Sequence, residues 1–167
     1  MIRLRFLLII SLFLLSAGCG FKLRGSMEIP PWFNNVALVN QGVHRDLVLT
    51  LKDQLQAYHV CVLPNIAAAS YLLILMNESS QQQISSISAS TTPRQYQLLY
   101  TVHYKLIKKS GELIIPEGQV LVTRQLTVNN DRILGSDAEE STTYSEMRRD
   151  AAMQIINRIN RHLDHHV

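Results

Sequence analysis

Residues 96–107, YQLLYTVHYKLI, carry the clearest structural signal in this chain. Every second residue from Tyr96 to Leu106 is aromatic or aliphatic, and a period of two is typical of a β-strand with one buried face. The next residues, 109–112, predict a turn, because Gly111 can take a positive φ at no steric cost. A return strand is predicted from about Glu117 to Val128. Its apolar side carries Val120, Val122, Leu126 and Val128. The pattern therefore predicts an antiparallel hairpin with one apolar face.

Two further apolar runs precede this hairpin. Residues 36–39, VALV, predict a buried strand, and residues 71–76, YLLILM, predict a central strand covered on both faces. Between the second run and the hairpin, residues 79–92 are rich in Ser and Gln. That composition suits either a mobile loop or an exposed strand, and both interpretations stay open.

Two helices are predicted around these strands. The first runs from about His44 to His59, where apolar residues recur at steps of three and four. The second is predicted to begin at a capping box formed by Ser136 and Glu139, and to end near His165. Helices that flank a run of antiparallel strands favour an α+β fold, with both helices on one face of the sheet.

The N-terminus predicts a lipoprotein. Arg3 and Arg5 precede a short apolar run, and the small residues that follow lead directly into Cys19. This junction resembles the lipobox of bacterial lipoproteins, which implies that residues 1–18 are a signal peptide and that Cys19 receives a diacylglycerol and an N-acyl group. The run is too short for a transmembrane anchor, and a structural cysteine after an ordinary signal is the alternative. Gly20, in place of an aspartate, favours the outer membrane.

After the leader, residues 19–35 are predicted to form a tether, extended at Pro30-Pro31-Trp32, and residues 36–167 a single α+β domain. Without Arg3 and Arg5 the chain has fourteen basic and thirteen acidic residues, so nothing indicates nucleic-acid binding. Cys61 would have no disulfide partner within the chain, and its apolar neighbours predict a small buried residue.

Signatures of enzymes and metal sites are missing from the sequence. It has no glycine-rich phosphate loop, no nucleophile elbow and no paired cysteines at metal-binding spacing. His162, His165 and His166 lie together near the C-terminus, but solvation of a helix end is the simpler explanation. We therefore expect no catalysis, no metal and no cofactor beyond the acyl groups on Cys19.

Four basic residues are candidates for binding an anion. Arg124 interrupts an apolar strand face, Arg94 stands beside Pro93 at the start of the long strand, and Lys105 and Arg132 complete the set. Guanidinium and ammonium groups suit phosphate or carboxylate. The alternative is that each is an ordinary surface or edge-strand charge, which discourages aggregation.

Three segments taken together resemble the family of the lipopolysaccharide-assembly lipoprotein LptE, formerly called rare lipoprotein B. They are residues 18–25 (GCGFKLRG), residues 95–98 (QYQL), and a tail comprising DRILG at 131–135, Glu139-Glu140, Tyr144 and EMRRDAA at 146–152. The resemblance covers essentially the whole mature length. The tail is its most specific part.

The resemblance implies two helices on a mostly antiparallel sheet of about four strands. It also implies an outer-membrane lipoprotein that assembles with the LptD barrel, plugs its lumen and binds lipopolysaccharide, with Arg94, Lys105, Arg124 and Arg132 as candidate contacts. An adaptor subunit of another envelope transport machine is the alternative, and an envelope hydrolase is disfavoured by the missing nucleophile and base.

Overall fold

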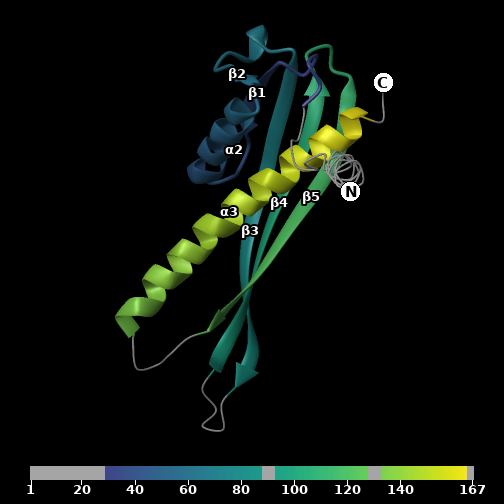
Figure 1. Ribbon diagram of the computed structural model, residues 1–167. Coiled ribbons are helices and arrows are strands. Elements are labelled where there is room, and N and C mark those ends of the chain that lie inside the picture. The colour runs from purple at the N-terminus through teal and green to yellow at the C-terminus, as the bar shows by residue number, and fades with distance from the viewer. Residues whose placement is uncertain (1–28, 88–92, 128–132, 165–167) are drawn as a thin grey trace, which may run out of the picture.

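The computed structural model describes residues 29–87, 93–127 and 133–164 as a sheet with two helices on one face (Figure 1). In chain order the elements are β1 (Asn35–Asn40), α2 (Arg45–Ala57), β2 (Cys61–Val62), the 3-10 turn η1 (Ile66–Ala68), β3 (Tyr71–Ile87), β4 (Pro93–Lys108), β5 (Leu113–Thr127) and α3 (Ile133–Asp164). Cys19 and the whole predicted signal peptide lie outside the described residues.

The sheet is mixed, with the strand order β2-β1-β3-β4-β5. β1 runs parallel to β2 and β3, whereas β3, β4 and β5 are antiparallel neighbours. A parallel connection needs a crossover, and α2 lies within the one that joins β1 to β3. The predicted α+β class and central β3 are confirmed. The sheet has five strands instead of about four, because the two-residue β2 adds an edge beside β1.

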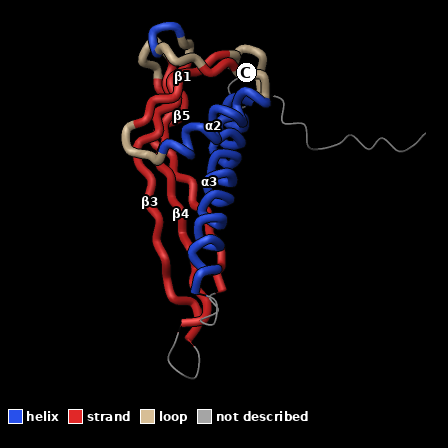
Figure 2. The backbone as a smooth tube through the Cα atoms, turned by 90° about the vertical axis from the view of Figure 1, so that its left-hand side faces the viewer, coloured by secondary structure: helices blue, strands red, loops and turns tan. Residues whose placement is uncertain are grey.

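β3 is much longer than residues 71–76, and it continues to Ile87 paired with β4, with residues 79–86 exposed. Of the two interpretations of this segment, the exposed strand is therefore confirmed up to Ser86, the strand itself ends at Ile87, and residues 88–92 are outside the described part. The sheet narrows along its length, because β1 pairs only with Tyr71–Leu75. Beyond that point β3, β4 and β5 extend as a long three-stranded blade (Figure 2).

A β-bulge at Met76 separates the two parts of β3. Leu75 pairs with Tyr104 and Asn77 pairs with His103, so Met76 has no partner of its own on β4. An extra residue reverses the alternation of side chains between the two faces. Beside the bulge, a Cβ on Gly42 would lie 2.9 Å from the Met76 carbonyl oxygen, which explains why a glycine passes there.

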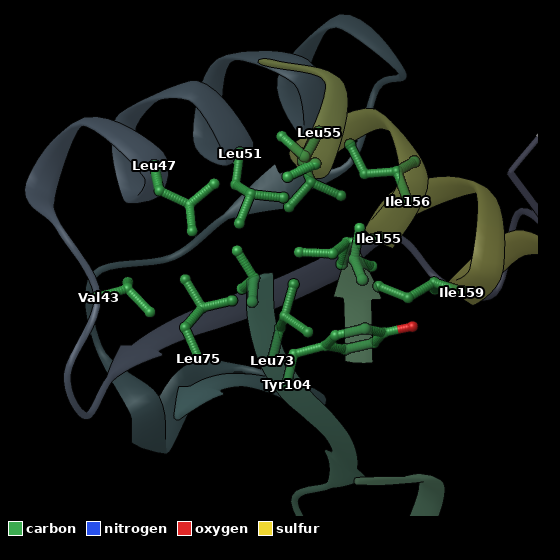
Figure 3. Packing of buried hydrophobic residues seen from close by; sticks show 14 of the residues in the cluster. Val43, Leu47, Leu51, Leu55, Leu73, Leu75, Tyr104, Ile155, Ile156 and Ile159 are labelled. Atoms are coloured by element: carbon green, nitrogen blue, oxygen red, sulfur yellow. The ribbon is translucent and has the colours of Figure 1, made fainter. Parts of the chain in front are cut away.

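The core lies between the sheet and the two helices. Leu47, Leu51 and Leu55 on α2 are fully buried, as the helical periodicity predicts. They meet Ile155, Ile156 and Ile159 of α3 above the buried β3 and β4 side chains Leu73, Leu75 and Tyr104 (Figure 3). The predicted inner face of the 96–107 strand is also confirmed, since Leu98, Tyr100, Val102, Tyr104 and Leu106 are at most 1 % exposed.

Three local predictions are wrong. Residues 30–33 form a turn in which the Phe33 N–H donates to the Pro30 carbonyl (2.9 Å), and this turn buries Phe33 against the Tyr71 ring. Cys61 is exposed, because the short β2 forms the edge of the sheet. α3 starts at Ile133, so Ser136 lies within the helix and is not its cap. One internal glycine, Gly135, costs a helix only about 1 kcal/mol and does not end it.

Within the described ranges, no helix is both long and apolar enough to cross a membrane.

Candidate functional site

The side of the sheet away from both helices forms a broad polar surface, which we call the open face. It consists of five cross-strand rows over β3, β4 and β5. These rows are Asn77–His103–Gln119, Ser79–Thr101–Leu121, Gln81–Leu99–Thr123, Gln83–Gln97–Gln125 and Ser86–Gln95–Thr127. The β3 and β5 members are exposed and the β4 members are half-buried, so no described element covers this face.

The open face carries hydrogen-bonding capacity with almost no charge. Its rows contain no Lys, Arg, Asp or Glu, and His103 is the only titratable member. The His103 Nδ1 atom lies 3.4 Å from Oε1 of Glu117, which borders the face. Uncharged amides and hydroxyls are far less costly to remove from water than ions. The surface is therefore suited to contact with another polar, largely uncharged surface.

On the helix-covered side, one polar cluster lies between the sheet and the two helices. The Tyr100 hydroxyl donates to Glu78 Oε2 at 2.7 Å, beneath α3. Arg148 of α3 reaches Asp46 of α2, with 3.9 Å between Nη1 and Oδ2. The buried Nε of Arg148 has no hydrogen-bond partner among the described residues. This cluster links β3, β4, α2 and α3 where the apolar core thins out.

Burial is the main reason that the pKa of Tyr100 is raised above its ordinary value, and the hydrogen bond to Glu78 adds to the effect. Arg148 acts in the opposite direction, since a nearby cation favours the phenolate. Burial likewise raises the pKa of Tyr144, one turn before Arg148 on α3. Both tyrosines stay protonated in the folded protein well beyond neutral pH, and Tyr100 uses its proton to donate the hydrogen bond to Glu78.

Two of the four candidate anion-binding residues have described side chains, and they lie on opposite faces. Arg124 of β5 forms an ion pair with Asp150 of α3, so its charge is used to dock the helix on the sheet. Lys105 of β4 is half-buried and stands opposite Ile74 of β3, beyond the end of the open face.

Arg94 cannot form a compact cluster with Lys105, and Arg132 lies outside the described residues. Arg94 belongs to β4, but its side chain is outside the described part, as is the whole of Arg132. Arg94 and Lys105 are eleven residues apart on one strand, which corresponds to about 36 Å. The structure therefore does not bring the four predicted residues together as one site.

The open face was not singled out from the sequence, although its signal was present. Uncharged residues, polar except for Leu99 and Leu121, stand at alternate positions of 79–83, 95–101 and 119–127 and mark one side of three neighbouring strands. Their common face becomes visible only with the register of the sheet. Among the described residues, no three His, Cys, Asp or Glu side chains gather in a way that would hold a metal ion.

Comparison with known proteins identifies similar chains. A family model described as LptE, lipopolysaccharide-assembly, matches residues 25–159. The LPS-assembly lipoprotein LptE of Photorhabdus laumondii is 26% identical over 151 residues, covering 87% of this chain and 79% of the relative. The protein of the same name from Pectobacterium atrosepticum is 28% identical over 147 residues, with the same coverage.

Among solved structures, lipoprotein B of Nitrosomonas europaea superposes with a TM-score of 0.71 at 25% sequence identity. The match covers 88% of this chain and 97% of that one. The similarity thus extends through both helices and the sheet.

Proposed function

Because this chain belongs to the LptE lipopolysaccharide-assembly family, we propose that it is an outer-membrane lipoprotein that assembles with an LptD-like β-barrel and fills its lumen. In this proposal the protein catalyses no reaction. Acyl groups on Cys19 hold it at the periplasmic side of the membrane, and the folded domain acts as a plug during lipopolysaccharide insertion. An adaptor role in another envelope machine is the competing outcome of the test below.

The open face is the observation that carries this proposal. The interior of an outer-membrane barrel is polar, and a plug must contact it without burying unpaired charges. The rows of Gln, Ser and Thr provide donors and acceptors over three strands and present only His103 as a titratable group. The side chains of these rows on β3 and β5 are exposed in the single chain, which supports the proposal that another protein covers them.

Binding of lipopolysaccharide is the second part of the proposal. Arg94 and Arg132 remain candidates to contact its phosphates, and Lys105 is a candidate with a described, half-buried position. Arg124 is the weakest of the four, since it would have to leave Asp150. Charge reversal at Arg94 together with Arg132 is expected to weaken lipopolysaccharide binding, more so at low ionic strength. Unchanged affinity would remove this pair from the site.

Co-purification of the acylated full-length chain from detergent-solubilised membranes tests the barrel. We expect a β-barrel that mass spectrometry identifies as LptD-like. The variant Gln125→Glu places one carboxylate within the Gln83–Gln97–Gln125 row at an exposed position, so folding stability should change by less than about 0.5 kcal/mol. In the complex the unpaired charge would cost about 3 kcal/mol, roughly a 150-fold loss of affinity.

The matched control is Gln125→Asn, which keeps an uncharged amide at the same position and should retain the barrel. If the wild-type chain recovers a different envelope machine, the adaptor alternative replaces this proposal. If the barrel is recovered equally by the wild-type chain and by Gln125→Glu, the open face is not the contact surface.

A further inference from the structure

The blade has two long edges, and the structure protects them differently. On β5, Pro116 and Glu117 lie near the start of the strand, and Arg158 of α3 donates to the outward Gln119 carbonyl at 2.6 Å. Charges, prolines and covering groups are the usual means by which a protein keeps an edge from pairing with another strand. The β5 edge therefore carries recognisable protection.

The β3 edge lacks such protection after the bulge. β1 pairs with β3 only as far as Leu75, whose carbonyl accepts the last hydrogen bond from that side, given by the Gln41 N–H (2.8 Å). From Asn77 to Ser86, β3 pairs with β4 alone. In Figure 1 no strand lies beside this part of β3 on the side away from β4.

The side chains along this edge also favour pairing. Residues 79–86, SSQQQISS, contain no charge, proline or glycine, and all of them are exposed. Segments with these properties are prone to pair with another strand when their edge is open. A segment from Asn77 to Ser86 spans about 33 Å, which is enough for a ladder of several main-chain hydrogen bonds.

Alternation determines which main-chain groups are available. Before the bulge, the odd-numbered residue Leu75 points its carbonyl away from β4, toward β1. Because Met76 is an extra residue, the main-chain groups that point away from β4 after the bulge belong to even-numbered residues. Glu78, Ser80, Gln82 and Ile84 then turn their N–H and C=O groups to the open side. The same rule turns odd-numbered residues of β5 outward, in agreement with the contact between Arg158 and the Gln119 carbonyl.

We propose that the β3 edge from Glu78 to Ile84 is completed by strand addition, and that the added strand is an extended, uncharged loop segment of the barrel folded into its lumen. This inference rests on the proposed function. The wall strands of a closed barrel have no free main-chain groups, whereas loops inside the lumen do. An uncharged loop is favoured because residues 79–84 of the edge carry no ion to pair with a charged one, and the Glu78 carboxylate already accepts a hydrogen bond from Tyr100 on the helix-covered side. The same strand also carries Ser79, Gln81 and Gln83 of the open face.

Residue-resolved hydrogen exchange on the full chain, alone and in its purified complex with the barrel, tests the proposal. Amides of Glu78, Ser80, Gln82 and Ile84 should become at least tenfold slower in the complex. The intervening amides, already bonded to β4, should change little. Side-chain docking would give no such period of two. Equal protection of all residues in the segment, or of none, would overturn strand addition.

A pair of substitutions separates main-chain from side-chain contacts. Gln82→Pro removes one outward N–H, and proline is tolerated where the N–H of an edge strand faces solvent. We expect roughly tenfold weaker retention of the barrel, because the loop carbonyl loses its donor. Gln82→Ala removes the side chain but keeps the N–H, and should retain the barrel. Equal behaviour of the two variants would contradict the proposal, provided that circular dichroism shows both are folded.

The outcomes also distinguish this inference from the proposed function. If the wild-type chain recovers no barrel, the proposed function fails and the occupant named here fails with it. If the barrel is recovered but the even-numbered amides keep their exchange rates, only strand addition fails. If the protein alone is a dimer in sedimentation and already shows the alternating protection, a second copy occupies the edge and the loop assignment is wrong.

Discussion

Replacing Tyr100 with phenylalanine removes one hydroxyl from the least apolar part of the interior. That hydroxyl donates to Glu78 Oε2 at 2.7 Å, and the Tyr100 side chain is fully buried. A hydrogen bond to a charged group contributes about 1.5–3 kcal/mol, and the variant also leaves a carboxylate oxygen short of a donor. We therefore expect Tyr100→Phe to lower the free energy of unfolding by about 2 kcal/mol at pH 8.

The pH dependence gives the prediction a sharper form. The pKa of Tyr100 is raised, mainly by burial and then by Glu78, so the folded state keeps the phenol proton after the unfolded state has lost it. This group has no effect on the pH dependence of stability below pH 10, near the pKa of an unfolded tyrosine. Above pH 10 wild-type stability falls by up to about 1.4 kcal/mol per pH unit, and the phenylalanine variant lacks that loss. The difference between the two proteins should thus shrink by about 1.4 kcal/mol between pH 8 and pH 11.

Urea unfolding followed by circular dichroism at several pH values measures both effects. The other tyrosines with a raised pKa, Tyr71, Tyr104 and Tyr144, are present in both proteins and cancel in the difference. Tyr96→Phe is the matched control on the same strand, because Tyr96 is half-buried and has no side-chain hydrogen bond to a described residue. A loss below 0.5 kcal/mol at pH 8, or a difference that grows with pH, would refute the reasoning.

Further substitutions probe other parts of the structure. A Cβ added by Gly118→Ala would lie 3.1 Å from Cζ of the buried Tyr104 ring, so we expect a loss of about 1–3 kcal/mol in urea unfolding. The loss should shrink in a Tyr104→Leu background, and equal losses in both would contradict the steric explanation. Leu51→Ala should lower the free energy of unfolding by about 2–5 kcal/mol, because the Leu51 side chain is fully buried and its removal leaves a cavity. A smaller loss would mean that the residues around α2 move in to fill that cavity. The Cys61 thiol should react with a maleimide in the native protein, and protection until denaturant is added would contradict its exposure.

Periodic burial explains why most of the core was predictable. The alternation in residues 96–106 and the helical spacing from Leu47 to Leu55 each reflect one face that must leave water. Residues 79–86 had no such signal, because their side chains are exposed and their strand conformation comes from main-chain pairing with β4. A sequence pattern indicates which side chains are buried. It does not indicate which strands pair with each other through main-chain hydrogen bonds.

The candidate site shows the same limit. Arg124 was correctly placed on the otherwise apolar face of its strand, but its partner Asp150 lies 26 residues further along the chain, on a helix whose docking the sequence does not specify. Likewise, the absence of charge on the open face is a property of three aligned strands. Each strand alone contains too few polar residues to stand out from an ordinary solvated surface.

The extra residue Met76 changes which side chains of β3 face the helices. Upstream of it the odd-numbered residues of β3 face the helices, and downstream the even-numbered ones do, which hides Glu78 under α3 and displays Ser79, Gln81 and Gln83 on the other side. Deleting that single residue would exchange the two faces for the rest of the strand, moving the Glu78 carboxylate onto the neutral surface and Ser79, Gln81 and Gln83 to the side of the sheet that carries the helices. The chemistry that β3 presents on each side of the sheet therefore depends on the number of residues in the strand as much as on their identity.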